Sequence, residues 1–172
     1  MLHYSRIRGK SAAMTTESAI EEKIGAILTA KGYTLATAES CSGGLIAHRI
    51  TNVAGSSSYF LGGIVSYNND AKTRLLGVDA DMISTHGAVS EEVAEAMARG
   101  ARDRFAADVA VGVTGIAGPG GGTREKPVGL VCIAVTGPAG TVVETCHFDG
   151  DREAVKERTS EKALTMILEQ IG

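Results

Sequence analysis

The feature that most constrains the fold is a short apolar segment that passes into a helix without a linker. Residues 33–38 have the composition of a buried strand, and a helical pattern of apolar residues begins near Leu45. Between them lies Glu-Ser-Cys-Ser-Gly-Gly, residues 39–44, which supplies hydroxyls, a thiol and glycines where the strand ends. A strand that runs directly into a helix in this way is typical of α/β proteins.

This junction has two interpretations. The N-terminus of a helix presents free backbone N–H groups and the positive end of the helix dipole, which favour an anion. The residues therefore suit a hydroxyl nucleophile, with the N–H groups of Ser42, Gly43 and Gly44 holding the oxyanion that forms on the substrate. They also suit a plain helix cap, because Ser is a preferred N-cap residue and Gly is tolerated there. In both cases we expect Ser42 to cap the helix.

The length of 172 residues predicts a single domain, which we expect over residues 14–172, and the order of helices and strands is of the α/β type. We expect Ser18 with Glu21 to cap the first helix, Asp70 to cap a short one and Ser90 to cap a longer one. The remaining elements are expected as helices over 16–31, 90–105 and 151–170, a strand over 59–67, a central strand over 108–114, and a hairpin of 128–136 and 141–148.

A glycine-rich segment, residues 115–127, follows the central strand. Open α/β sheets bind ligands at the carboxyl ends of their strands, so this segment is expected to line a ligand site. No helix follows the glycines in the predicted order of elements, which disfavours a dinucleotide-binding or P-loop fold.

The composition disfavours several classes of partner. A formal net charge of −3, without clusters of Lys or Arg, disfavours direct binding of DNA or RNA. Three cysteines without a C-x-x-C pair indicate neither a disulfide framework nor a metal site, and they favour a cytoplasmic location. Cys132 and Cys146 are expected on opposite faces of the hairpin. No apolar segment approaches the ~18 residues of a membrane span. We expect residues 1–13, which lack a signal-peptide core, to be a disordered extension.

A hydroxyl nucleophile needs a base within about 3 Å. His48 is a poor candidate, because it lies two turns after Ser40 on the predicted helix. Lys72 is better placed, since it follows the end of the second strand by one helical turn and can reach the sheet edge that displays Ser40. A lysine can act as a base when burial lowers its pKa, but most lysines at such a position are solvated. Spacing leaves both interpretations open. Tyr67, five residues earlier, can hydrogen-bond either partner.

Three long motifs point to one family. They comprise residues 36–44, residues 60–72, and residues 112–123 with 126–129. Over residues 16–172 the chain resembles the CinA C-terminal domain family, the nicotinamide-nucleotide amidases, also called nicotinamide mononucleotide deamidases. The resemblance implies a three-layer α/β/α sandwich on a mixed, mostly parallel five-stranded sheet. It also implies hydrolysis of the carboxamide of nicotinamide mononucleotide to nicotinic acid mononucleotide and ammonia, in pyridine nucleotide salvage, without a metal or other cofactor.

The resemblance also implies roles for individual residues. Carried over by motif, Ser40 is the nucleophile, Lys72 its base and Tyr67 an assisting group. Arg152 is the expected phosphate or carboxylate contact, since a cation in the first turn of a helix opposes the dipole and needs another role. The full set of expected substrate-binding residues is Ser42, Gly43, Gly44, Thr114, Gly115 and Arg152.

Several alternatives stay open on the sequence. Cys41 is a rival nucleophile, since thiols are intrinsically stronger. A nucleotide-binding module without catalysis, or an interaction protein in competence or DNA repair as the family's name suggests, is also compatible with the chain. Ser42 and Leu130 stand where the family commonly has Thr, a difference that removes no proposed catalytic group. The strictness of substrate preference is open, and a homodimer is compatible with a domain of this size.

Overall fold

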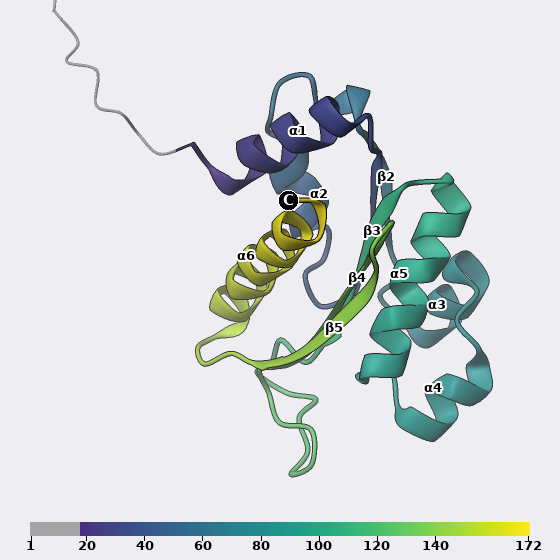
Figure 1. Ribbon diagram of the computed structural model, residues 1–172. Helices are drawn as coiled ribbons and strands as arrows, with labels where there is room; N and C mark the ends of the chain where they lie inside the picture. Colours follow the sequence, from purple (N-terminus) through teal and green to yellow (C-terminus); the bar gives the residue numbers. More distant parts are fainter. Residues whose placement is uncertain (1–17) are drawn as a thin grey trace, which may run out of the picture.

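The computed structural model describes residues 18–172, so the expected extension over residues 1–13 lies outside the described residues. Within that range a mixed sheet is covered by helices on both faces (Figure 1). The strands are β1 (Leu35–Glu39), β2 (Phe60–Val65), β3 (Val109–Gly115), β4 (Leu130–Gly137) and β5 (Gly140–His147). The helices are α1 (Ile20–Lys31), α2 (Leu45–Thr51), α3 (Asn69–Leu76), α4 (Ala80–His86), α5 (Glu91–Phe105) and α6 (Arg152–Ile171), with a 3-10 turn at Ser56–Ser58.

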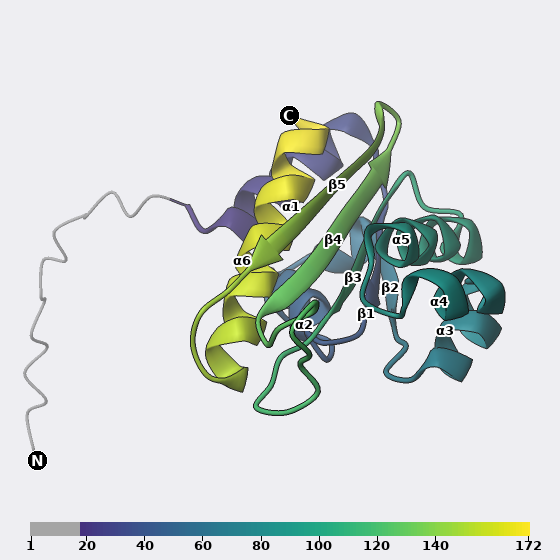
Figure 2. The same cartoon turned by 90° about the horizontal axis from the view of Figure 1, so that it is seen from below.

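The sheet has the strand order β2-β1-β3-β4-β5. Strands β2, β1 and β3 are parallel neighbours, whereas β4 is antiparallel to both β3 and β5. Four strands therefore share one direction and β4 opposes them. Helices α1, α2 and α6 lie on one side of the sheet, and α3, α4 and α5 lie on the other (Figures 1 and 2). This confirms the expected three-layer α/β/α sandwich on a mixed, mostly parallel sheet.

The central strand β3 is buried along almost its whole length, as its run of valines predicts. On one face its valines belong to the same apolar cluster as Ile24 of α1 and Leu164 and Ile167 of α6. On the other face Gly112 allows α5 to approach closely, because a Cβ at this position would lie 2.3 Å from the carbonyl oxygen of Ala94. Both helical layers thus hold β3, and with it the start of the loop that follows.

The predicted capping box at the first helix is wrong. Helix α1 has Ala19 as its N-cap and no side-chain cap bond, so Ser18 and Glu21 do not cap it together. At the amino end of α5 the prediction is confirmed, since the Ser90 hydroxyl accepts from the N–H of Val93. Helix α4 was not predicted, because one short turn with few apolar residues produces no readable period.

Helix α3 is capped by Asn68 rather than by the predicted Asp70. The Asn68 side chain accepts a hydrogen bond of 2.7 Å from the N–H of Ala71. Both residue types are good caps, so composition alone did not separate them. The consequence is that α3 begins one residue after the cap and places Lys72 in its first turn.

In the hairpin of β4 and β5, Thr136 lies opposite Thr141. With this register Cys132 and Cys146 are one residue out of line across the pair, and they point to opposite faces of the sheet as predicted. All three cysteines of the chain are free.

Because β1, β2 and β3 run in the same direction, their carboxyl ends meet at one edge of the sheet. Strand β1 ends at the nucleophile turn (residues 40–44), β2 leads toward α3, and β3 opens into the glycine loop (residues 116–129). The glycine loop extends from this edge of the molecule (Figures 1 and 2). The three segments that the sequence singled out are therefore neighbours.

Candidate active site

Ser40 and Lys72 lie together at the carboxyl edge of the sheet. Ser40 directly follows β1, and Lys72 belongs to the helix that follows the neighbouring strand β2. The Lys72 Nζ donates to Ser40 Oγ at 3.1 Å and to the carbonyl oxygen of Ser66 at 2.8 Å. The two residues expected as nucleophile and base are thus within hydrogen-bonding distance.

Lys72 is buried without an acidic partner. Only 2% of its surface is exposed, and none of the ion pairs among residues 18–172 involves it. Burial lowers the pKa of Lys72 below the ordinary value for lysine, because the charged form is poorly solvated there. A neutral amine at this position can accept the proton of the Ser40 hydroxyl. The alternative of an ordinary solvated lysine is therefore wrong.

Cys41, the rival nucleophile, is adjacent to Ser40 but chemically unsuited. Its side chain is 5% exposed, and burial raises the pKa of the thiol to about 12. At neutral pH it is a protonated thiol, and the thiolate is the reactive form of cysteine. The geometry and the protonation states together favour Ser40 as the nucleophile.

The nucleophile turn is built around Glu39, the last residue of β1. The Glu39 carboxylate is 1% exposed. It accepts hydrogen bonds of 2.8–3.1 Å from the Ser42 hydroxyl and from the N–H groups of Gly44, Ile46 and Ala47. These include N–H groups that a helix leaves unpaired in its first turn. Glu39 therefore caps α2 from inside the protein, a role that the sequence analysis did not assign; its only signal was a charge at the end of an apolar strand.

Glu39 changes the predicted roles of the residues that follow Ser40. The N-cap of α2 is Gly44 without a side-chain cap bond, so the prediction that Ser42 caps this helix is wrong. The N–H of Gly43 donates to the carbonyl oxygen of Ser40 at 3.0 Å, and that of Gly44 donates to Glu39. The prediction that these two N–H groups are free for an oxyanion is therefore also wrong. Burial dominates the raised pKa of the Cys41 thiol, and an interaction with the N–H of Ser42 opposes it weakly; sulfur is a poor hydrogen-bond acceptor.

Ser40 opens into a pocket of about 250 Å³, whose walls include Cys41, Tyr67, Arg152 and part of the glycine loop. The Arg152 guanidinium donates to the carbonyl oxygen of Gly118 at 2.7 Å and to the Tyr67 hydroxyl. Tyr67 makes this bond to Arg152 rather than the expected one to Ser40 or Lys72. Arg152 thus joins α6 to the glycine loop and to Tyr67, and its predicted contact with a phosphate or carboxylate stays a prediction.

Thr114 and Gly115, which were both expected to contact the substrate, have different positions. The Thr114 hydroxyl donates to the carbonyl oxygen of Ala88 at 2.7 Å, and this residue is not part of the pocket wall. Gly115 does line the pocket. A Cβ at Gly115 would lie 2.9 Å from the sulfur of Cys41, so a side chain there would press on the nucleophile turn. Thr114 therefore ties the end of β3 to the segment before α5.

A larger hollow of about 620 Å³ lies between α1, α2 and α6. Its central charge, Arg49, is paired with Glu21 at 2.5 Å and with Glu161 at 2.8 Å. His48 is on its wall, while His86 pairs with Glu92 at 3.2 Å. Neither histidine lines the Ser40 pocket. The larger hollow does not contain Ser40 or Lys72, and the charge of Arg49 within it is already balanced by two carboxylates.

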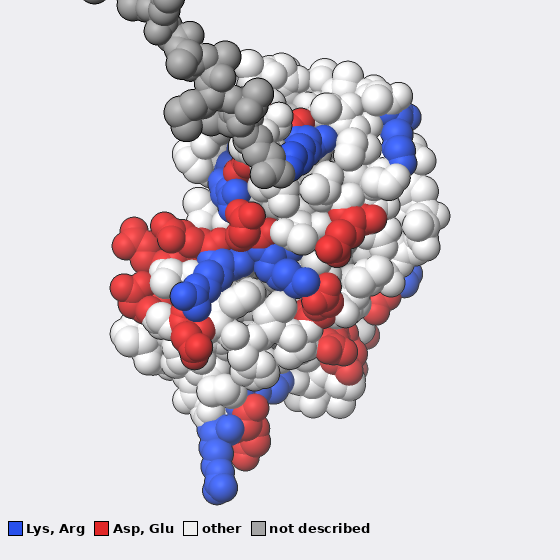
Figure 3. Space-filling view, turned by 60° about the vertical axis from the view of Figure 1, so that its left-hand side comes forward, with Lys and Arg blue, Asp and Glu red and all other residues white. Residues whose placement is uncertain are grey.

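The described residues bring together no cluster of three or more His, Cys, Asp or Glu side chains that could hold a metal ion. No helix within residues 18–172 is both long enough and apolar enough to cross a membrane. On the face drawn in Figure 3, Lys and Arg side chains lie among Asp and Glu rather than in one broad basic patch.

The fold and the site define an α/β protein with a buried serine–lysine pair at the carboxyl edge of its sheet. The CinA C-terminal domain family matches residues 17–171, and the chain belongs to this family. A competence-damage inducible protein of Symbiobacterium thermophilum is 54% identical over 160 residues, which cover 88% of this chain and 38% of that protein. A CinA-like protein of Mycolicibacterium gilvum is 56% identical over 149 residues, which cover 86% and 35%. The chain thus spans less than half the length of these relatives.

Solved structures share this fold. A competence/damage inducible protein from Agrobacterium tumefaciens has a TM-score of 0.83 at 45% identity, covering 87% of this chain and 94% of that one. A CinA superfamily protein from Enterobacter cloacae has a TM-score of 0.86 at 29% identity, covering 99% of both chains. The family resemblance inferred from the sequence motifs is confirmed.

Proposed function

We propose that the chain is an amidohydrolase that releases ammonia from the carboxamide of nicotinamide mononucleotide and leaves nicotinic acid mononucleotide. The observation that carries this proposal is the buried pair of Ser40 and Lys72, whose Oγ and Nζ are 3.1 Å apart, with Ser40 lining a pocket. Membership of the CinA family is consistent with an enzyme of this kind. Arg152 on the pocket wall suits a phosphorylated substrate.

In the first half of the proposed reaction, neutral Lys72 takes the proton of the Ser40 hydroxyl while Oγ attacks the carboxamide carbon. The resulting oxyanion is stabilised by the N–H of Ser42, which has only a weak partner in the free protein. The C–N bond then breaks, and the proton held by Lys72 passes to the leaving nitrogen. Ammonia departs and an acyl ester remains on Ser40.

In the second half, water attacks the ester carbon while Lys72 accepts the water's proton. The ester C–O bond breaks, the proton returns to Ser40 Oγ, and the carboxylic acid leaves. One base therefore serves both halves, and every proton released by a nucleophile has an acceptor within the site.

The test is ammonia release from nicotinamide mononucleotide by the wild type and by Ser40→Ala and Lys72→Met. We expect each variant to lose about 10³-fold or more of kcat, because the nucleophile and its base act as a unit. Lys162→Met is the matched control, since Lys162 lies further along α6 and, within the described residues 18–172, forms its ion pair with Glu144. A rate near that of the wild type in either variant would remove that residue from its role. Cys41→Ser should keep most of the activity.

The pH profile gives a second readout of the base. Because Lys72 acts in its neutral form, kcat/KM should rise with pH as the ammonium loses its proton. Since burial lowers the pKa of Lys72, this rise should level off below the ordinary lysine pKa of about 10.4. If the mononucleotide binds but no ammonia is released at any pH, the chain is a binding module rather than an enzyme.

A further inference from the structure

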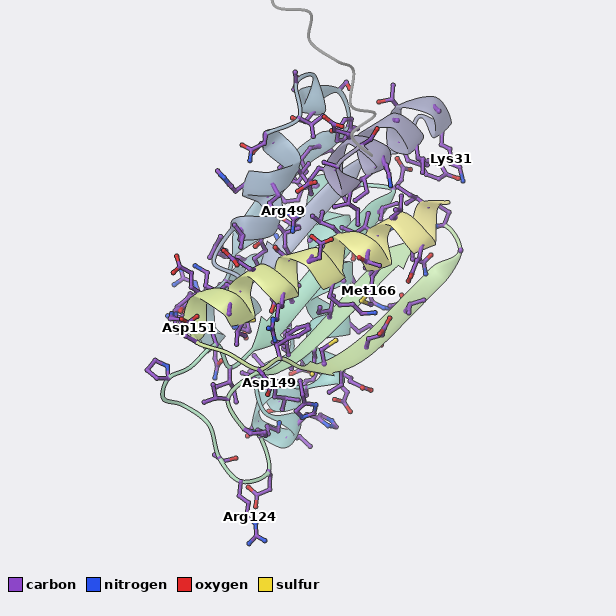
Figure 4. The ribbon with its side chains drawn as sticks, turned by 90° about the vertical axis from the view of Figure 1, so that its left-hand side faces the viewer. Lys31, Arg49, Arg124, Asp149, Asp151 and Met166 are labelled. Carbon is purple, nitrogen blue, oxygen red and sulfur yellow. The ribbon has the colours of Figure 1, made fainter. Side chains whose placement is uncertain are left out.

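A second hollow lies next to the Ser40 pocket, and Arg152 lines both. The first has a volume of about 250 Å³, which is below the roughly 300–1,000 Å³ usual for ligand pockets. The second, of about 420 Å³, is lined by Asp151, Arg152, Glu153 and Lys156, so both hollows share Arg152. Figure 4 shows the start of α6, marked by Asp151, at the end of the molecule from which the glycine loop extends. A ligand in the Ser40 pocket would therefore have further space on the side of Arg152.

Lys156 brings a second cation to this place. It follows Arg152 by one helical turn, so both side chains leave the same face of α6. A Cβ at Gly43 would lie 3.6 Å from the Lys156 Nζ, which places this ammonium beside the nucleophile turn. Two cations from α6 thus flank the residue that carries out the proposed attack.

Neither cation is neutralised by a neighbouring carboxylate. The Arg152 guanidinium donates to a carbonyl and a phenol oxygen, both uncharged. Among residues 18–172 no ion pair involves Lys156 or Arg152. Asp151 uses its carboxylate to accept from the N–H of Ala154 at 2.9 Å, and Glu153 is an exposed neighbour that pairs with neither. The two positive charges are therefore available to a ligand.

We propose that Lys156, together with Arg152, binds the phosphate monoester of the substrate and selects a mononucleotide over the riboside or the free amide. This inference rests on the proposed function and deepens it. A guanidinium fork and a mobile ammonium are the side chains best suited to a phosphate dianion. Lys156 is thus a specificity residue, and it takes no part in the proton transfers at Ser40.

The experiment compares ammonia release from nicotinamide mononucleotide and from nicotinamide riboside by the wild type, Lys156→Gln and Lys156→Arg. Lys156→Gln should raise KM for the mononucleotide about tenfold, leave its kcat nearly unchanged, and leave kcat/KM for the riboside unchanged. Lys156→Arg should retain most of the mononucleotide activity, because it keeps the charge. Lys162→Gln, the same substitution further along α6, should change neither substrate.

Equal losses for both substrates in Lys156→Gln would overturn the proposal, since they would indicate a structural role beside the nucleophile turn. Unchanged KM for the mononucleotide would overturn it as well. If the wild type releases no ammonia from either compound, the proposed function fails, and calorimetric binding of the mononucleotide then decides the inference separately. Binding that weakens about tenfold in Lys156→Gln would support the phosphate site without catalysis, and equal binding or none would overturn it.

Discussion

The nucleophile turn and the glycine loop are both rich in glycine, and both follow the carboxyl ends of adjacent parallel strands. At the nucleophile turn and the start of α2, the N–H groups of Gly44, Ile46 and Ala47 donate to the buried carboxylate of Glu39. The N–H of Gly43 donates to the carbonyl oxygen of Ser40. In the glycine loop, residues 119–125 are exposed. Backbone hydrogen bonds of Ile116 with Leu130 and Gly129 close its base, and the N–H of Thr123 donates to the carbonyl oxygen of Lys126 at 2.8 Å beside its tip. Two glycine-rich segments thus differ in how their backbone is held: the turn is bonded to a buried carboxylate, whereas most of the loop is exposed to solvent.

The difference shows what decides the rigidity of a glycine-rich segment. Glycine lets the backbone adopt a positive φ, as at Gly43 (65°) and Gly44 (96°) in the turn and at Gly118 (83°) and Gly121 (85°) in the loop. Rigidity comes from the groups that satisfy the backbone once it is bent. A buried carboxylate does this for the turn, which has to hold Ser40 against Lys72. The loop forms part of a pocket wall, and it is held by side-chain bonds of Lys126 and Arg152 to backbone carbonyl oxygens.

The largest effect is expected for Glu39→Gln. The amide keeps the size of the side chain but turns an N–H donor toward the donors that Glu39 satisfies. We expect the free energy of unfolding to fall by about 2–4 kcal/mol, because buried donors lose a charged acceptor. Ammonia release should fall as well, since the turn no longer holds Ser40 in place. Urea unfolding and the ammonia assay measure the two effects.

Glu161→Gln is the control for the loss of a carboxylate, because Glu161 is exposed and its ion pair with Arg49 lies near the surface. It should cost less than about 1 kcal/mol. If Glu39→Gln proved as stable as this control, the turn would not depend on its buried carboxylate, and the contrast with the loop would lose its basis.

A moderate effect is expected for Lys126→Met. The Lys126 Nζ donates to the carbonyl oxygens of His86 at 2.6 Å and Val89 at 2.7 Å, which ties the glycine loop to the segment before α5. Without these bonds the loop should open more often, and the protein should lose about 1 kcal/mol of stability. Trypsin should then cut faster after Arg124, which lies at the tip of the loop (Figure 4). The KM of the enzyme should rise, because the loop lines the pocket.

Lys31→Met provides the comparison for this experiment. Lys31 also donates to a carbonyl oxygen, that of Gly172 at 3.1 Å, but it lies at the end of α1. This variant should leave cleavage after Arg124 at the wild-type rate. Equal cleavage rates in both variants would mean that Lys126 does not hold the loop.

The smallest effect of all is expected at Gly120, which serves as the comparison for Gly43. Gly43→Ala places a side chain at φ 65°, which should cost about 1–2 kcal/mol. Gly120 has no positive φ, and a Cβ there would meet no atom within 4 Å, so Gly120→Ala should stay within about 0.5 kcal/mol of the wild type. Urea unfolding of both variants measures the difference. Equal costs at the two positions would show that the turn is no more constrained than the loop.

Local sequence patterns predicted most of the secondary structure. The valines of β3, the register of Thr136 and Thr141, and the strand-to-helix junction before α2 each depend on neighbours in the chain. Helix starts were predicted less well. Asn68 and Asp70 are both good N-cap residues, and the backbone conformation determines that Asn68 caps α3. The pairing of Ser40 with Lys72 was an open alternative until the family motifs were considered, because a lysine in a helix is usually solvated.

The sequence by itself determined the order of the elements and the reactive residue types at the strand ends, because periodicity and junctions are local properties. Only the tertiary structure decided which polar groups are already satisfied. The Glu39 carboxylate reaches Ala47, Thr114 reaches Ala88, and Arg152 bonds to Tyr67, which is 85 residues away in sequence. A donor pairs with whichever acceptor the fold brings close to it. The packing of the layers therefore determines which donors of the site remain free for a ligand.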